Sequence, residues 1–215
     1  MRKLIIKTSV SLDGFVSTTD KKNDWVFPSS DKGSGDWTIA DLWNAGLHIM
    51  GSNTFHDMAS WWPGSTEVFA PVMNEIPKAV FSKDPHTTAR EKWSDRAKIE
   101  SDTGQKSSAN SKNATPEKEQ SWRDARVLTG DLAEEITKLK GEPGKDIYAH
   151  GGSSFLQSLV NTGLVDEYHL LVHPVALGNG FGLFAKLPQR AVLRLMSAQA
   201  FEKGAVAHIY VPSQA

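Results

Sequence analysis

Short apolar runs alternate with amphipathic and polar stretches along most of this 215-residue chain. Apolar runs bounded by turn residues predict buried strands, and they fall at 4–10, 47–50, 78–81, 146–149 and 167–174. Apolar residues at helical spacing between these runs predict helices, at 38–44, 54–60, 131–140 and 154–162. The first of these helices is expected to have Asp36 or Thr38 near its N-cap.

The C-terminal part follows a different pattern. Segments 192–200 and 205–211 predict two antiparallel strands joined by a turn at Lys203-Gly204. Strand–helix alternation followed by a hairpin indicates an α/β protein with a mixed sheet, mostly parallel with an antiparallel C-terminal edge. At this length the chain buries one good core, so we expect a single domain over 1–215.

Two polar segments interrupt the alternation. Residues 17–36 predict a long loop with aromatic anchors at Trp25 and Phe27, and loops of this length often carry function. Residues 100–120 contain only two apolar side chains, both alanines, which predicts a disordered or loosely packed surface segment. We interpret about 86–126 as a polar insertion.

Composition narrows the function classes. The chain has 24 basic and 25 acidic residues, so nothing in its charge favours nucleic acid or an anionic membrane. It has no cysteine, and its seven histidines show no metal-binding spacing, so no metal site is expected. No run approaches the roughly 20 apolar residues of a membrane span, and the start is too polar for a signal peptide. A cytoplasmic protein is therefore expected.

The junction after the predicted strand at 146–149 is a candidate phosphate site. Gly151 and Gly152 let the backbone approach a pyrophosphate, and the N-terminus of the following helix attracts the anion. Ser153 and Ser154 add hydroxyl donors. The alternative is a tight strand-to-helix turn that binds nothing.

Two other strand ends have similar chemistry. Gly51, Ser52, Asn53 and Thr54 follow the second strand, and Thr54 would cap the helix and also donate to a phosphate, or cap the helix alone. Ser82 and Lys83 follow the third strand, where they would meet a ribose phosphate or form an ordinary exposed loop.

Acidic residues near the N-terminus are candidates for the substrate side. A carboxylate there would orient or protonate a nitrogen heterocycle. Asp24 beside Trp25 suits a flat polar substrate, whereas Asp13 beside Gly14 also fits a plain turn. Asp36 and Asp41 would alternatively support the first turn of a helix.

Five segments in order resemble the dihydrofolate reductase-like superfamily. The closer resemblance is to the bacterial group related to the reductase domain of the bifunctional riboflavin-biosynthesis deaminase–reductase. The segments are 11–16, 50–55, 80–83, 148–152 with 164–167, and 173–184. The resemblance covers 1–85 and 127–211.

This resemblance implies a three-layer α/β/α fold, bound NADPH and a homodimer. It places cofactor contacts at Gly51, Ser52, Asn53, Thr54, Ser82, Lys83, Gly151, Gly152, Ser153 and Ser154. It places Leu177, Gly178 and Asp13 at the substrate and nicotinamide. Two residues depart from the family pattern: Ser52 stands where arginine is usual, and His150 stands where the riboflavin enzymes have glutamate.

The leading hypothesis is an NADPH-dependent reductase that transfers a hydride to a C=N or C=O bond of a small pterin-like or pyrimidine-like heterocycle. Asp13, Asp24 and Trp25 would shape its substrate end. The alternative is a non-catalytic nucleotide- or pterin-binding protein on the same fold, which the departures at Ser52 and His150 favour. A third possibility is that the polar segment 100–120 docks a protein partner.

Overall fold

The computed structural model describes residues 1–87 and 113–213. Its strands are β1 (Leu4–Ser11), β2 (Phe15–Ser17), β3 (Ala45–Gly51), β4 (Lys78–Phe81), β5 (Arg126–Leu128), β6 (Asp146–Ala149), β7 (Glu167–His173), β8 (Phe181–Gly182), β9 (Leu193–Ala200) and β10 (Val206–Pro212). Eight of them form one sheet in the order β5-β4-β3-β6-β1-β7-β10-β9, and β2 pairs with β8 beside it.

The sheet is mixed as predicted. Neighbours from β5 to β7 pair in parallel, while β10 runs antiparallel to both β7 and β9. The predicted closing hairpin is thus confirmed, with Gly204 at φ +91° in its turn. The parallel strands are covered on both faces, so consecutive apolar residues such as Leu4, Ile5 and Ile6 pack alternately into the two layers.

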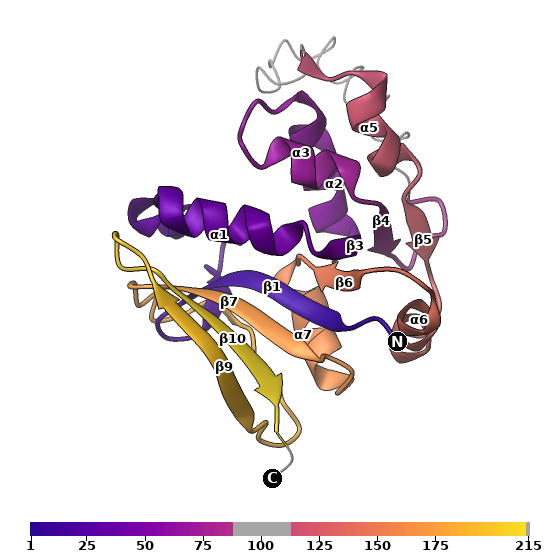
Figure 1. The fold of residues 1–215 in the computed structure, drawn as a ribbon. Coiled ribbons are helices and arrows are strands. Elements are labelled where there is room, and N and C mark those ends of the chain that lie inside the picture. The colour runs from indigo at the N-terminus through magenta and orange to yellow at the C-terminus, as the bar shows by residue number, and fades with distance from the viewer. Residues whose placement is uncertain (88–112, 214–215) are drawn as a thin grey trace.

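Helices cover both faces of the sheet (Figure 1). They are η1 (Asp24–Ser29), α1 (Lys32–Leu42), α2 (Ser52–Trp61), η2 (Trp62–Gly64), α3 (Ala70–Glu75), α5 (Pro116–Arg123), α6 (Leu132–Gly141) and α7 (Ser153–Asn161). One core contains side chains of α6 and α7 packed on one face, which we call the α7 face. A second core contains side chains of α1, α2, α3 and α5 on the other, which we call the α2 face.

Strand alternation decides which side chains meet each layer. In β1, Leu4 and Ile6 belong to the α7-face core, and Ile5 belongs to the α2-face core. In β6, Ile147 and Ala149 likewise face α7, and Tyr148 faces α2. A three-layer α/β/α arrangement follows.

Helix α1 begins earlier than the sequence pattern predicted. Its N-cap is Asp31, not Asp36 or Thr38, because Asp31 and Ser34 form a capping box. The Asp31 carboxylate accepts from the Ser34 amide at 2.8 Å, and the Ser34 hydroxyl accepts from the Asp31 amide at 3.0 Å. The predicted loop 17–36 therefore ends five residues before its expected limit.

The predicted polar insertion contains a well-packed helix. Residues 88–112 lie outside the described chain, but Pro116–Arg123 forms α5. Trp122 of this helix is fully buried, and its indole donates to Asn74 Oδ1 of α3 at 2.8 Å. The expectation of a loosely packed segment over 100–120 is therefore wrong for the residues from Pro116 onward, which belong to α5. Trp122, just after that segment, anchors this helix against α3.

Candidate functional site

The carboxyl ends of β3 and β6 form the junction where the predicted cofactor residues meet. These two strands are parallel neighbours, yet α2 leaves β3 toward one face and α7 leaves β6 toward the other. Open α/β sheets bind nucleotides at such a switch point, outside the carboxyl ends of the strands. The structure thus brings Gly51–Thr54 and Gly151–Ser154 together.

Close packing at this junction leaves little room for a Cβ at Gly51 or Gly152. The Gly51 amide donates to the Gly151 carbonyl at 2.9 Å. A Cβ built on Gly51 would lie 3.2 Å from Phe155 Cβ, and one on Gly152 would lie 3.1 Å from Thr54 Oγ1. Gly151 has φ +131°, which side-chain-bearing residues rarely adopt.

Both helix N-termini at the junction are suited to an anion. Gly51 is the N-cap of α2 and Gly152 the N-cap of α7, and neither cap offers a side chain to the first-turn amides. The first turns contain no acidic residue and present Ser52, Asn53, Ser153 and Ser154 instead. Thr54 lies inside α2 and packs on Gly152, so the expectation that it caps the helix is wrong.

Ser82 and Lys83 lie beside this junction at the end of β4. Phe81 of β4 pairs with Gly51 of β3, so Ser82 follows directly after the residue that pairs with the junction. The Ser82 hydroxyl is bonded to Thr87 Oγ1 at 2.6 Å and accepts from the Asp84 amide at 3.1 Å. Lys83 is exposed, so its ammonium is open to solvent and to a ligand.

Asp13 joins the turn after β1 to the loop that follows β7. Its carboxylate accepts from the amides of Leu177 at 3.1 Å and Gly178 at 2.8 Å, so the structure unites all three residues expected at the substrate. Ser11 also donates to it at 2.6 Å. These hydrogen bonds, that of Ser11 foremost, lower the pKa of Asp13 to about 2. Asp13 is thus an ionised loop anchor rather than a proton donor.

Asp24 and Trp25 lie apart from the glycine junction, in η1. Asp24 is exposed, whereas Trp25 is half-buried and stacks edge-on against His173 with ring centroids 5.6 Å apart. His173 is itself held by Ser29 at 2.7 Å and Ser9 at 3.1 Å. Trp25 is thus packed against His173 at the end of β7, whereas the Asp24 side chain lies on the surface.

Sequence reasoning missed a polar row on the α2 face, formed by Lys7, His48 and His150. Ile6 pairs with Ala149, so Lys7 and His150 stand next to each other one residue further along β1 and β6. The rings of His48 and His150 meet edge-on with centroids 4.3 Å apart. The available signal was a lysine inside the apolar run 4–10 and a histidine immediately before Gly151.

Burial shapes the protonation of this row. Burial lowers the pKa of Lys7 to about 7, although Asp41 opposes the shift. Burial, with Lys78 and Lys7 nearby, lowers the pKa of His150 to about 3, and burial also lowers that of His48 well below its ordinary value. At neutral pH both imidazoles are uncharged, and Lys7 titrates.

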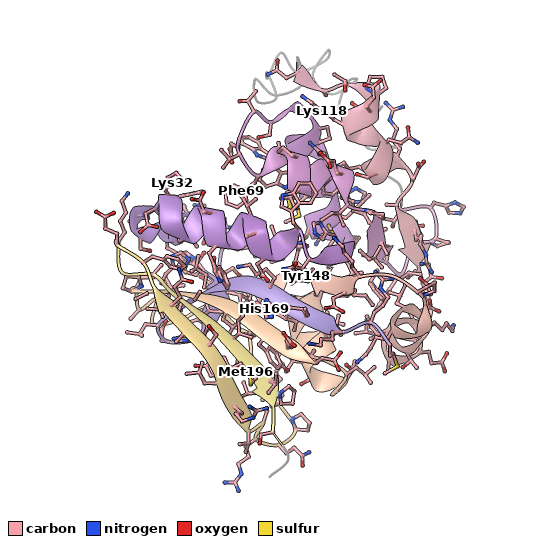
Figure 2. All side chains as sticks on the ribbon, viewed as in Figure 1. Lys32, Phe69, Lys118, Tyr148, His169 and Met196 are labelled. Carbon is pink, nitrogen blue, oxygen red and sulfur yellow. The ribbon has the colours of Figure 1, made fainter. Side chains whose placement is uncertain are left out.

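A second polar group ties α1 to the sheet. Asp41 Oδ1, in the last turn of α1, meets His169 Nδ1 at 2.8 Å and accepts from the Tyr148 hydroxyl at 3.0 Å. His169 Nε2 meets Glu167 at 2.8 Å, and Glu167 pairs with Lys3 at 2.6 Å. Tyr148 and His169 lie together beneath α1 (Figure 2). Burial by itself lowers the pKa of His169, but Asp41 and Glu167 more than offset this and raise it.

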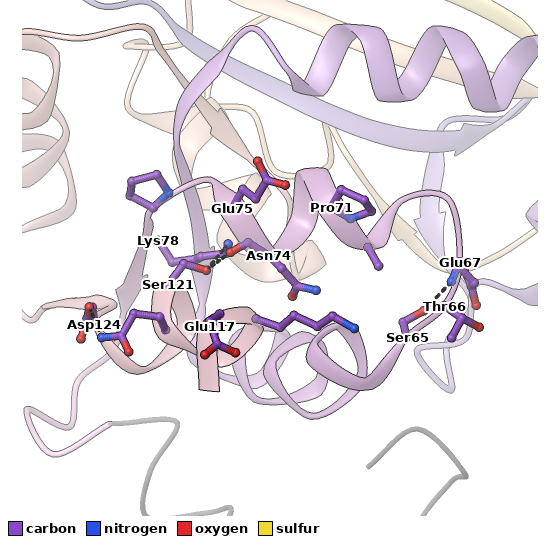
Figure 3. A pocket seen from close by; sticks show the side chains of 14 residues that line it. Ser65, Thr66, Glu67, Pro71, Asn74, Glu75, Lys78, Glu117, Ser121 and Asp124 are labelled. Carbon is purple, nitrogen blue, oxygen red and sulfur yellow. Dashed lines mark hydrogen bonds between the residues drawn. The ribbon is translucent and has the colours of Figure 1, made fainter. Parts of the chain in front are cut away.

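A cleft of about 700 Å³ lies elsewhere, between α3 and α5 (Figure 3). Lys78 reaches it and donates to Ser121 Oγ at 2.8 Å, while Glu75, Glu117 and Asp124 line it. None of the expected site residues lines this cleft.

In the described part of the chain, no helix is long and apolar enough to cross a membrane.

Sequence comparison identifies related proteins along nearly the whole chain. The family model for the RibD C-terminal domain matches residues 2–207. YyaP of Bacillus subtilis is 29% identical over 209 residues, covering 97% of this chain and 94% of its own.

Structural comparison identifies the fold. A putative riboflavin biosynthesis protein from Shewanella sp. PV-4 superposes with a TM-score of 0.66 at 17% identity, covering 99% of both chains. Dihydrofolate reductase from Enterococcus faecalis, solved with NADP(H), superposes with a TM-score of 0.55 at 11% identity, covering 99% of this chain and 97% of the other. The chain therefore has a dihydrofolate reductase-like fold and belongs to the RibD C-terminal domain family.

Proposed function

We propose that this protein is an NADPH-dependent reductase that transfers a hydride to a small pyrimidine-like or pterin-like heterocycle. The observation that carries the proposal is the junction of α2 and α7, where two helix N-termini without side-chain caps meet at glycines whose Cβ atoms would crowd their neighbours. Family membership supports a reductase-type activity.

The residues of the junction fit a dinucleotide. The first-turn amides of α2 and α7, with Ser52, Asn53, Thr54, Ser153 and Ser154, would hold the pyrophosphate, because free N–H groups and the helix dipoles favour an anion there. Lys83 would meet the adenosine ribose phosphate as a point charge. The nicotinamide, when bound, supplies the hydride.

The substrate end would be formed by the Asp13 loop and by Trp25. Asp13 fixes the backbone of Leu177 and Gly178 at the carboxyl end of the sheet, so it would act by positioning this loop. Trp25 offers an aromatic edge held against His173. Proton transfer is not assigned to Asp13, because its hydrogen bonds hold it in the ionised form.

The test is a titration of the purified protein with NADPH and NADH, followed by quenching of tryptophan fluorescence. We expect saturable NADPH binding that Gly152→Asp weakens at least about a hundredfold, because a carboxylate would enter the anion site against Thr54. Gly141→Asp is the matched control, since a Cβ there meets no atom within 4 Å. Equal affinity in Gly152→Asp and the wild type would contradict the proposal.

Turnover separates the reductase from a binding protein. Cofactor oxidation with a panel of pyrimidines and pterins is expected for the reductase. Tight NADPH binding without oxidation across the panel would favour the non-catalytic alternative.

We also propose that the chain forms a homodimer. The edge strand β9 supports this, because Leu195 and Met196 are about half exposed, at 49% and 51%, and exposed apolar edges favour pairing. Light scattering at micromolar concentration measures the mass directly, and a monomer would contradict the proposal.

A further inference from the structure

One polar side chain is buried in the helix that begins at the proposed cofactor junction. Gln157 of α7 is 9% exposed and lies among the core residues Leu156, Leu159 and Val160. Its Nε2 donates to the Gly182 carbonyl of β8 at 2.8 Å. Because a buried amide is stable only when it is hydrogen-bonded, this contact fixes α7 against the chain segment that contains β8.

Gln157 lies one helical turn from the N-terminus of α7. Ser153 is the first residue of this nine-residue helix, and Gln157 follows four residues later, so both side chains lie on the same side of the helix. The core residues of α7 pack it against the sheet as one element. An anion at the first-turn amides would therefore hold the same rigid element that carries Gln157.

The other partner of this contact belongs to the proposed substrate end. Residues 174–184, which we call the 174–184 segment, include Leu177 and Gly178, whose amides donate to Asp13 at 3.1 and 2.8 Å. Within this segment, β8 also pairs with β2. The segment is thus held on one side by the turn after β1 and on the other by Gln157.

We infer that Gln157 is a positioning residue that couples nucleotide binding at the α7 N-terminus to the order of the 174–184 segment. This inference rests on the proposed function, because it links the cofactor end and the substrate end of the same site. A nucleotide on the first turn would restrict the motion of α7, and the bond to Gly182 would then restrict the motion of the segment. The nucleotide would therefore bind first and order the place where the heterocycle binds.

The test measures hydrogen exchange of backbone amides with and without 2′-phospho-ADP-ribose. This probe contains the pyrophosphate and the ribose phosphate of NADPH but has no nicotinamide, so it would occupy the junction without touching the substrate end. We expect peptides from the 174–184 segment to exchange about threefold more slowly when the probe is saturating.

Two substitutions of Gln157 remove the coupling in different ways. Gln157→Leu has a similar size but no donor, and Gln157→Asn keeps the amide but is one methylene too short to reach Gly182. Both should abolish the slowing caused by the probe, while probe affinity changes less than about twofold. A purely structural role would instead raise exchange of the segment in the free protein and leave the effect of the probe intact.

Ser158→Ala is the matched control. Ser158 is the next residue of the same helix, but it is exposed and its hydroxyl donates to the Ser154 carbonyl at 2.9 Å, within α7. This variant should keep the slowing seen in the wild type. Circular dichroism establishes that each variant is folded, and Gln157→Asn tests the inference even if Gln157→Leu unfolds.

Unchanged slowing in the two Gln157 variants would overturn the inference, and so would an equal loss of slowing in Ser158→Ala. Calorimetry on the same samples measures probe affinity and separates the two proposals. Probe binding to the wild type without slowing of the 174–184 segment would overturn the coupling alone. Failure of both the probe and NADPH to bind would contradict the proposed function and the coupling with it.

Discussion

The glycine junction and the buried polar group of Asp41, Tyr148 and His169 beneath α1 lie a few residues apart on β6, yet they are built in different ways. The junction uses backbone: glycines, amides and two helix N-termini. The polar group uses buried side chains from α1, β6 and β7 that meet only in the folded sheet. A site built from backbone groups can be recognised from a short local motif such as paired glycines. A site built from side chains of several strands can be recognised only once the pairing of those strands is known.

The largest expected effect on stability comes from the buried polar group of Asp41, Tyr148 and His169. Asp41→Ala would leave His169 and Tyr148 without their shared acceptor, and breaking such a buried group costs about 3–5 kcal/mol. Chemical denaturation measures this change in the free energy of unfolding. NADPH affinity should change less than about threefold, or 0.7 kcal/mol, under native conditions. A much larger loss of affinity would mean that the two regions act as one.

A substitution in the glycine junction is expected to weaken NADPH binding with little change in the free energy of unfolding. Gly152→Ala would place a methyl group 3.1 Å from Thr54 Oγ1, so Thr54 must shift within the proposed phosphate site. We expect NADPH to bind about tenfold more weakly, which is about 1.4 kcal/mol, with a small change in unfolding free energy. Fluorescence titration and denaturation on one preparation measure both. A loss of stability without a loss of affinity would contradict a binding role for this glycine.

The elements of the fold also differ in how well the sequence predicted them. Apolar runs and glycines were enough to predict β1, β3, β4, β6, β7 and the closing hairpin, because these signals are local. The capping box of Asp31 was hidden in a polar stretch, and α5 depends on one buried tryptophan whose partner, Asn74, lies 48 residues earlier.

The candidate functional residues divide in the same way. Glycine and serine motifs at strand ends singled out Gly51 and Gly151. The family resemblance placed Asp13, Leu177 and Gly178 at the substrate but did not predict the hydrogen bonds that join them. Lys7, His48 and His150 were not predicted as a cluster, because their contact follows from the pairing of β1, β3 and β6. The alternation of side chains along one strand does not predict which side chains of other strands a buried polar residue contacts.

A smaller effect concerns pH. The pKa of His169 is raised in the folded protein, so its bonds to Asp41 and Glu167 stabilise the fold fully below the ordinary histidine pKa of about 6.5 and are lost as pH rises through the raised value. The difference in unfolding free energy between the wild type and His169→Gln should therefore be larger near about pH 6 than near about pH 9. A difference that grows with pH would contradict the assigned charge state.

The smallest expected effect concerns the choice of nucleotide. Lys83 is exposed, and a surface ion pair is worth at most about 1 kcal/mol. Lys83→Ala should reduce NADPH affinity a few-fold and leave NADH affinity unchanged, because only NADPH has the extra phosphate. Titration with both nucleotides checks this, with Lys186→Ala, another loop lysine, as control. Equal loss for both nucleotides would place Lys83 elsewhere on the ligand.

The most direct measurement is a crystal structure of the protein grown with NADP⁺. We predict the pyrophosphate within hydrogen-bonding distance of the first-turn amides of α2 and α7, between Ser52 and Ser153, with the nicotinamide toward Asp13 and His150. Nucleotide bound in the cleft between α3 and α5 instead, or an empty junction at saturating NADP⁺, would contradict this account of the site.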